Sequence, residues 1–365
     1  MPNAHVHPQP HNPNPSPPAN LEDGPVPPER LERELFVSEH GPDLPPNIEN
    51  SKPAPTLFGP KLAKHLQTHA YLTIFSIFGT LARLGLTALT TYPGAPLGAG
   101  TVIWPNFAGS AVMGFLVEDA RLVGAKRTTL PLFTGLTTGF CGSFTSFSSF
   151  ELDMFRFVAG GRSGGNDFMA AAAYAIATLA LSLGGLQFGA HVSHASRRVL
   201  RPLPERGLRA LDWIAVPLAL ACWVAAVVMA VEIPRWRSDA LWACALSPPG
   251  VYARFWISRT LNPKFRSFPV GTFMCNIGGT LVVAGMSIGM GRSWDVDACG
   301  ALRGVASGFC GCLTTVSTFV VEVRGLSVRS AYRYAVWSVG VGLVVMLVML
   351  GGWTWGMGRE LVCRT

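Results

Sequence analysis

Charged residues are scarce in this sequence. Asp, Glu, Lys and Arg make up 14% of its 365 residues, whereas soluble domains usually carry about 25%. Hydrophobic residues make up 49%, and the mean hydropathy is +0.34. A soluble protein of this composition would have to bury many stretches of about 20 apolar residues in one core. The composition therefore predicts an all-α membrane protein.

The residues that carry most enzyme and metal chemistry are missing from the apolar segments. The eight histidines lie in the first 60 residues, just before the first apolar segment, or at 191–194. Cys310-x-Cys312 lacks zinc-site spacing and a paired histidine, so we interpret the eight cysteines as small packing residues. The sequence has no metal-ligand set, nucleophile–base pair or phosphate-binding loop, which argues against an enzyme. It also has no basic stripe interleaved with aromatics, so we expect no nucleic-acid partner.

The first 60 residues differ in composition from the rest. They contain 16 of the 28 prolines and no Trp. Three basic and eight acidic residues give them a net charge of −5, which leaves +13 for the remainder because the whole chain carries +8. Such a segment buries too little apolar surface to offset the entropy of ordering, so we expect residues 1–60 to be disordered. They have no basic-then-apolar start and no small-residue cleavage site, so we do not expect a signal peptide.

Three sequence features occur twice, in the same order and at offsets of 169 to 171 residues. Gly79-x-x-x-Arg83 returns as Gly250-x-x-x-Arg254, and Asn106-x-x-Gly109 returns as Asn276-x-x-Gly279. The segment 139–150 (GFCGSFTSFSSF) returns as 308–319 (GFCGCLTTVSTF). Three ordered features at one offset predict an internal duplication of about 120 residues.

The apolar pattern predicts nine helical spans. They lie near 70–91, 101–117, 129–157, 168–191, 211–232, 240–258, 268–290, 299–323 and 330–356. Four spans belong to each repeat, and the fifth is a single linker helix between them. Because four spans return the chain to its starting side and one more crosses, the second repeat enters from the opposite side. We therefore expect two inverted four-helix repeats, a pseudo-dimer within one monomeric chain.

The same pattern divides the chain into five parts. They are the tail 1–60, the first repeat 61–195, a basic loop with the linker helix 196–239, the second repeat 240–357 and a short tail 358–365. On the sides that we predict as inner and outer, Lys and Arg number 16 and 8. This bias places the N-terminus in the cytoplasm and the C-terminus outside, with the basic residues at anionic lipid headgroups. We expect the protein to be located in the plasma membrane.

The third and eighth spans contain the Gly-rich repeated segments, and we expect each helix to be broken at its glycines, Gly139 and Gly142 or Gly308 and Gly311. A broken helix frees carbonyls that can ligate a small cation, and amides that can bind an anion. Hydroxyl groups are abundant in both segments: Thr145, Ser146, Ser148, Ser149, Thr314, Thr315, Ser317 and Thr318. Neither segment contains Asp or Glu, which argues against a carboxylate-lined cation path. Glu151 follows the first segment directly, and we expect it to cap the helix or to face water.

Phe147 and Phe150 are three residues apart, so they share a helix face. Ordinary packing would explain that spacing. The alternative is functional, because the positive edge of a phenyl ring can meet an anion without offering it a full charge.

These motifs resemble the fluoride channel family, called CrcB or Fluc in bacteria, in its fused eukaryotic nine-span form. The resemblance covers about 79–190 and 250–350. It implies a passive channel with two paths that is selective for fluoride and exports it. It also implies a structural sodium ion, held by the backbone carbonyls of Gly142, Thr145, Gly311 and Thr314. Oxygen ligands suit that hard cation.

The resemblance also implies the residues of the two paths. They are Asn106 and Asn276, Phe147, Phe150 and Phe319, the hydroxyls of Ser148, Ser149, Ser317 and Thr318, and the fourth-span residues Tyr174, Thr178, Ser182 and Ser338. Two positions depart from the pattern, where Val316 replaces a Phe and Gly342 replaces a hydroxyl. The repeated arginines, Arg83 and Arg254, are expected to be structural. Amides and hydroxyls along the whole path would replace the water of fluoride without a fixed cation to trap it.

Because Val316 leaves one pair without a second ring, we expect one working path, with Phe147 and Phe319, and one decayed path, with Val316 and Phe150. The loss at Gly342 points to the same decay in the second repeat, but the sequence assigns it to neither path. A secondary transporter for another small anion or solute is the alternative, since inverted repeats and broken helices are common there. The lack of a midplane carboxylate or His to couple protons argues against it. A membrane scaffold without transport would not need eight hydroxyls in two breaks.

Overall fold

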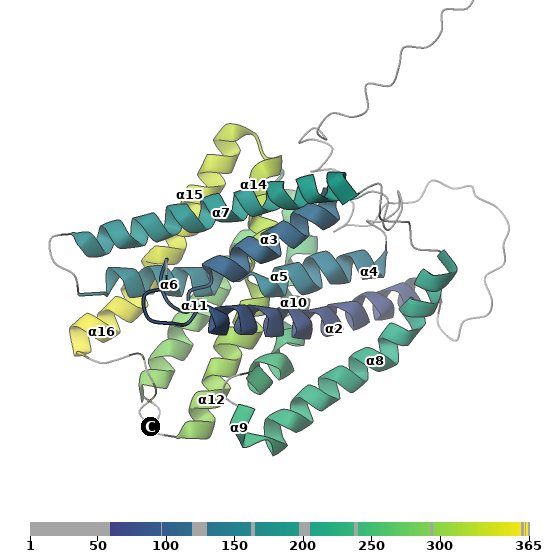
Figure 1. The fold of residues 1–365 in the computed structure, drawn as a ribbon, viewed down its shortest axis with the longest axis horizontal. Helices are drawn as coiled ribbons and strands as arrows, with labels where there is room; N and C mark the ends of the chain where they lie inside the picture. The colour runs from purple at the N-terminus through teal and green to yellow at the C-terminus, as the bar shows by residue number, and fades with distance from the viewer. Residues whose placement is uncertain are drawn as a thin grey trace, which may run out of the picture.

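The computed structural model describes residues 59–95, 97–118, 130–161, 165–196, 205–236, 240–292 and 295–358, together with Leu361 and Cys363. Within these residues the chain is helical and contains no strand (Figure 1). The tail predicted as disordered lies outside the described residues up to position 58. So do the loops 119–129 and 197–204, which carry part of the basic residues counted above.

The first half of the described chain contains a long helix, a shorter one, a composite broken helix and another long helix. These are α2 (Pro60–Leu89), α3 (Ile103–Glu118), α4 (Pro131–Thr134) with the π-helix η2 (Gly135–Cys141), α5 (Gly142–Phe144), α6 (Phe147–Val158) and α7 (Asn166–Ser196). Helix α8 (Glu205–Glu232) and the short α9 (Pro234–Trp236) follow. Figure 1 shows α8 along one flank of the molecule, beside α2.

The second half repeats this order. Its elements are α10 (Trp242–Leu261), the 3-10 turn η4 (Asn262–Lys264), α11 (Val270–Arg292), α12 (Val296–Gly304) with the π-helix η5 (Val305–Cys310), α13 (Gly311–Leu313), α14 (Ser317–Gly325), α15 (Val328–Met346), the π-helix η6 (Leu347–Gly351) and α16 (Gly352–Met357). Each predicted broken span is thus a π-helix, one short α-helical turn and a separate helix.

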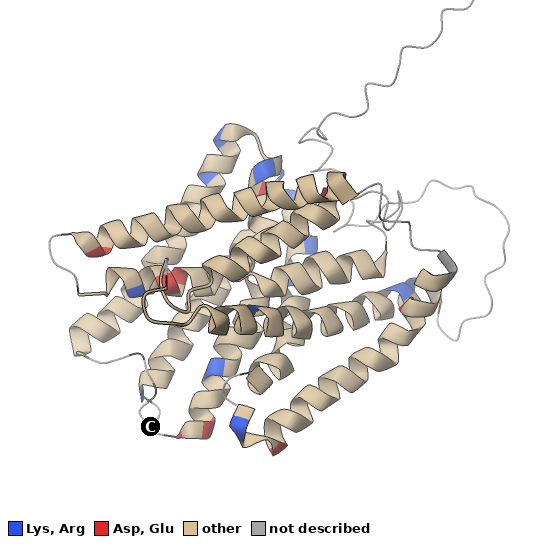
Figure 2. Cartoon of the chain, in the orientation of Figure 1, with Lys and Arg blue, Asp and Glu red and all other residues tan. Residues whose placement is uncertain are grey.

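Six helical stretches in the described part of the chain are long and apolar enough to cross a membrane. They are Lys61–Leu89, Asn166–Ser196, Ala210–Glu232, Val270–Arg292, Val296–Gly325 and Val328–Met357. The predicted spans near 101–117, 129–157 and 240–258 correspond to α3, α4–α6 and α10, which fall outside that set. Figure 2 shows helices that are mostly uncharged along their length, with Lys, Arg, Asp and Glu mainly toward helix ends. An all-α membrane protein is confirmed at this level.

Contacts between the two halves are reciprocal. Helix α6 of the first half packs against α11 and α15 of the second, and α14 packs against α3 and α7. The short helices α5 and α13, which precede the two breaks, pack against one another. Equivalent elements of the two halves therefore make equivalent contacts with the opposite half.

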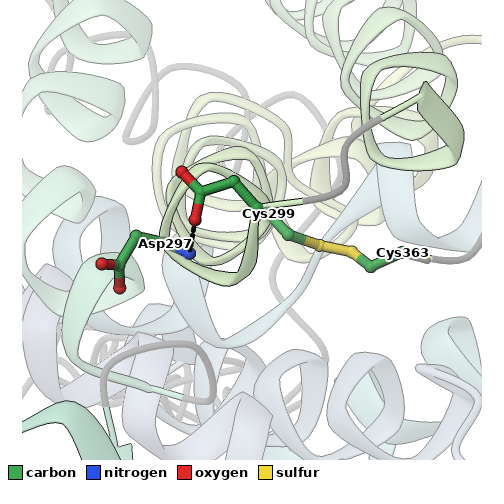
Figure 3. The surroundings of a disulfide bond; sticks show 4 residues. Asp297, Cys299 and Cys363 are labelled. Carbon is green, nitrogen blue, oxygen red and sulfur yellow. Dashed lines mark hydrogen bonds between the residues drawn. A yellow bond between two sulfur atoms is a disulfide. The ribbon is translucent and has the colours of Figure 1, made fainter. Parts of the chain in front are cut away.

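One pair of cysteines corrects the interpretation that all eight are packing residues. Cys299, near the start of α12, forms a disulfide with Cys363 near the C-terminus (Figure 3). Cys141, Cys310 and Cys312 are fully buried, as packing residues would be. Of this pair, only Cys363 lies outside the predicted apolar spans, so the sequence did not reveal the pairing.

Candidate functional site

Both composite helices are interrupted at a threonine. Thr145 and Thr314 each have φ −95° and ψ 154°, which is extended backbone. The prediction that the glycines form the breaks is wrong, since Gly142 (φ −67°, ψ −27°) and Gly311 (φ −61°, ψ −27°) are helical. Gly139 lies inside η2, and its counterpart in the second half lies inside η5.

The glycines serve close packing instead of chain breaking. A Cβ at Gly308 would lie 2.7 Å from Ala243 Cα, and one at Gly139 would lie 2.9 Å from Phe75 Cβ. At Gly142 and Gly311 a Cβ would collide with the guanidinium groups of the two repeated arginines. The repeated glycines therefore let neighbouring helices and two buried arginines approach the backbone.

An asparagine from a neighbouring helix holds each break. The Ser146 amide donates to Asn106 Oδ1 over 2.9 Å, and Asn106 Nδ2 donates to the Ser146 carbonyl over 3.4 Å. Thr315 and Asn276 form the same pair, with distances of 2.9 and 3.2 Å. Each amide thus bonds a side chain instead of the helical carbonyl four residues earlier, which ends the helix. Both asparagines are fully buried.

The hydroxyl groups of the two break threonines cross between the halves. Thr145 Oγ1 accepts hydrogen bonds from the amides of Val316 (3.2 Å) and Ser317 (3.1 Å) at the start of α14. Thr314 Oγ1 accepts from the Ser148 amide (3.1 Å) at the start of α6. Each threonine therefore caps the helix of the other half. The amides of Val316, Ser317 and Ser148, which we expected to be free for an anion, are therefore occupied.

The serine hydroxyls of the breaks also bond within the protein. Ser146 Oγ donates to Ser149 Oγ over 2.9 Å and accepts from the Ser149 amide over 3.2 Å. Ser148 Oγ lies 3.0 Å from Thr314 Oγ1. The hydroxyls of Ser146, Ser148, Ser149 and Thr314 form a network that joins the breaks. Thr318 is partly buried and lines a small cavity with Thr138 and Arg254.

Arg83 and Arg254 are 2% exposed and bridge the halves through backbone carbonyls. Arg83 donates to Ser143 O (2.5 Å) in its own half, and to Gly311 O (2.9 Å) and Ser307 O in the other. Arg254 donates to Cys312 O and Thr138 O, both over 2.7 Å, again one in each half. Carbonyls in the segments that precede the two breaks thus receive charged donors.

The predicted phenylalanines form one buried group. The ring centroids of Phe147 and Phe319 are 5.7 Å apart with an interplanar angle of 61°, and Phe147 meets Phe150 at the same distance. Val316, which occupies the fourth position, is 1% exposed and belongs to the same cluster. Phe150 also packs on Tyr174, 5.8 Å between centroids, as the corresponding pair does in the second half.

Two rows of fourth-span residues are buried alongside these rings. They are Tyr174, Thr178 and Ser182 on α7, and Tyr334, Ser338 and Gly342 on α15. The hydroxyls of Ser182, Ser338 and Ser110 have no hydrogen-bond partner among the described residues. Buried hydroxyl groups are usually paired, so unpaired ones aligned on helix faces can serve a bound or passing ligand.

Two carboxylates, the buried Asp153 and the partly buried Glu322, were missed from the sequence. Asp153 accepts from Tyr174 Oη (3.1 Å) and the Val102 amide (3.0 Å). Glu322 accepts from Tyr334 Oη over 2.7 Å, and also from the side chains of a Thr and an Asn. Each acid follows the last Phe of its segment by three residues, so the repeat itself could have revealed the pair. Both carboxylates orient a tyrosine of a fourth-span row.

Glu151 corrects two expectations. It neither caps a helix nor faces water, because it is fully buried and neither carboxyl oxygen has a hydrogen-bond partner in the described part of the chain. A carboxyl group therefore does lie beside the first break. Its neighbour is Gly342 on α15, where a Cβ would lie 2.7 Å from Glu151 Oε1.

These contacts assign Gly342 to the side of the intact Phe pair. Glu151 follows Phe147 by one helical turn, so the two share a face of α6. Gly342 lies two turns beyond Tyr334, which packs on Phe319 with 5.0 Å between centroids. The loss at Gly342, which the sequence assigns to neither path, thus lies on a different side from Val316. By the same correspondence between the halves, the row on α7 lies on the side of Phe150, where Val316 replaces a Phe.

The described residues contain no group of three or more His, Cys, Asp or Glu side chains that could hold a metal ion. The backbone offers a different donor set where the carboxyl ends of α5 and α13 meet. Gly311 O already accepts from Arg83, but a carbonyl has two lone pairs. The oxygen donors of Gly142, Thr145, Gly311 and Thr314 thus fit a hard cation in type.

A protein-family comparison agrees with this architecture. The model of the family described as CrcB-like protein, Camphor Resistance (CrcB), matches residues 70–190 and again residues 241–352. The chain belongs to this family. One family unit matches each half, as an internal duplication requires.

Similar proteins include whole-length and half-length relatives. The chain is 40% identical over 372 aligned positions to Fluoride export protein 1 of Neurospora crassa, covering 82% of this chain and 69% of the relative. It is 34% identical over 336 positions to Fluoride export protein 1 of Candida albicans, covering 85% of each. It is 34% identical over 100 positions to the Fluoride-specific ion channel FluC of Klebsiella pneumoniae, covering 27% of this chain and 78% of that one.

Proposed function

We propose that this chain is a passive, fluoride-selective channel that exports fluoride across the plasma membrane. The names of its family relatives support the ion and the direction. The observation that carries the proposal is the group of buried Phe rings in edge contact, with α6 packed on α15, whose Ser338 hydroxyl has no hydrogen-bond partner among the described residues. Fluoride is small and strongly hydrated, so its water must be replaced by donors and positive edges that do not trap it.

The channel architecture in this proposal is a pair of inverted repeats within a monomer. Arg83 and Arg254 hold the breaks together through carbonyl oxygens, so they act structurally and do not bind the ion. A sodium ion held by the carbonyls of Gly142, Thr145, Gly311 and Thr314 would further link the two carboxyl ends. It would add charge stabilisation there and take no part in conduction.

One path works in this proposal. It is lined by Phe147 and Phe319, by the α15 row and by Asn276 on α11, which packs on both α6 and α15. The side with Val316 lacks a ring edge at one position and became structural, since a fused chain needs a single working path.

A topology prediction follows from the single linker helix α8. The N-terminus is expected in the cytoplasm and the C-terminus outside, because the Lys and Arg bias places them there. The disulfide from Cys299 to Cys363 supports an outer C-terminus, since disulfides persist in oxidising compartments. Tags at both ends of the chain, tested with an impermeant reagent in intact cells, should give opposite accessibility. Two tags on the same side would refute the inverted arrangement.

A second prediction concerns the N-terminal tail. Deletion of about the first 50 residues should leave fluoride efflux per folded protein within about twofold of the full chain, because the segment lacks a core-forming pattern. Efflux from liposomes, normalised to reconstituted protein, measures this. A larger loss at normal expression would mean that the tail contributes to transport.

A secondary transporter remains a distinct hypothesis because Glu151 supplies the buried carboxyl group that proton coupling would need. Fluoride efflux driven only by the fluoride gradient, at equal pH on both sides, supports the channel. Efflux that requires a proton gradient supports the transporter.

A further inference from the structure

Glu151 is an unexplained group beside the rings of the proposed path. It is fully buried, and neither of its oxygens has a hydrogen-bond partner among the described residues. An unpaired buried polar group destabilises the fold, so one that persists next to a functional cluster calls for a role. In apolar surroundings without a partner, the neutral carboxylic acid is the stable form, and its O–H is a hydrogen-bond donor.

The position of Glu151 matches the place where the second repeat lost a hydroxyl. By the repeat correspondence, Glu151 aligns with Val320, and Gly342 aligns with Ser182. On one side of the molecule Val320 is thus combined with Ser182, and on the other side Glu151 is combined with Gly342. The glycine is required there, because a Cβ at 342 would lie 2.7 Å from Glu151 Oε1.

We propose that the Glu151 carboxyl replaces the hydroxyl missing at Gly342 and donates a hydrogen bond to fluoride in the path lined by Phe147 and Phe319. This inference rests on the proposed function. A donor supplied from α6 in place of α15 continues the row beyond Ser338. Tyr334 already donates its hydroxyl to Glu322, so fluoride would meet the Ser338 hydroxyl and then the Glu151 carboxyl at successive turns of α15.

The test copies the arrangement of one repeat into the other. Glu151→Val should lower fluoride efflux from liposomes at least about tenfold, because the path loses its donor at this level. Adding Gly342→Ser to Glu151→Val recreates the Val320 and Ser182 pair and should restore efflux to within about threefold of the unchanged chain. Gly342→Ser alone should be impaired by its collision with the carboxyl group.

Two further variants separate chemistry from packing. Glu151→Gln keeps the shape and a donor N–H, so most efflux should remain, within about threefold. Val320→Ala removes a buried side chain at the aligned position and should leave efflux near that of the unchanged chain. Size-exclusion elution and melting temperature, measured for every variant, identify any loss that is due to misfolding.

Several results would overturn the inference. If Glu151→Val left efflux unchanged, the carboxyl group would lie outside the path. If Glu151→Val increased efflux, the carboxyl group would obstruct the path. An inactive but folded Glu151→Gln, or no restoration by Gly342→Ser, would exclude a role as a simple donor. These results leave the proposed function standing, provided that the unchanged chain conducts fluoride. Absence of fluoride efflux from the unchanged chain would overturn the proposed function and this inference together.

Discussion

Replacement of Phe147 or Phe319 by isoleucine is expected to reduce fluoride efflux to the level of protein-free liposomes. Isoleucine keeps much of the apolar bulk but has no positive ring edge to offer an anion. The two rings are in edge contact, 5.7 Å between centroids, and both are buried. They form the intact pair of the working path, so each change should remove an interaction that the other ring cannot replace.

Phe150→Ile is the matched control, because it makes the same change one helical turn away. Phe150 packs on Tyr174 of α7, on the side that has Val316 in place of a ring. It should therefore retain efflux within about threefold of the unchanged chain. Equal losses from Phe147→Ile and Phe150→Ile, at matched reconstitution, would refute a single working path while leaving the channel assignment intact.

The second large effect is expected from Arg254→Met, as a loss of folded protein. The change leaves the buried carbonyls of Cys312 and Thr138 without their charged donor. Each unpaired carbonyl costs about 1–3 kcal/mol, and together they are a large part of the stability of a typical domain. Arg254→Lys should not rescue the fold fully, since one ammonium cannot reproduce the planar fork of donors.

Melting temperature and size-exclusion elution in detergent measure this effect. Arg329→Met, at an exposed site on α15, is the control and should melt like the unchanged chain. A folded Arg254→Met protein with a normal melting temperature and no efflux would contradict a structural role. It would place the guanidinium group in the conduction path instead.

The duplication was predictable because each landmark is a short local pattern. Glycine spacing, paired hydroxyls and the repeated arginines are visible within a few residues of one another. The helical spans followed from composition in the same way, and α7, α11 and α15 lie close to the predicted ranges. A property held in local sequence can be inferred without knowing what the segment packs against.

The features that escaped prediction depend on partners from distant segments. The breaks lie at Thr145 and Thr314 because an asparagine from another helix takes the next amide, which no glycine pattern reveals. The environment of Glu151 is set by Gly342, a residue of the other repeat. Pairing between Cys299 and Cys363 likewise joins segments 64 residues apart.

Fluoride efflux from liposomes that contain only the purified chain tests the central claim most directly. A potassium ionophore balances charge, pH is equal on both sides, and a fluoride electrode records release, with chloride-loaded liposomes as the control. The account predicts rapid fluoride release driven by its gradient alone and no chloride release above that of empty liposomes. Equal release of both anions, or fluoride release only under a proton gradient, would contradict a passive fluoride-selective channel.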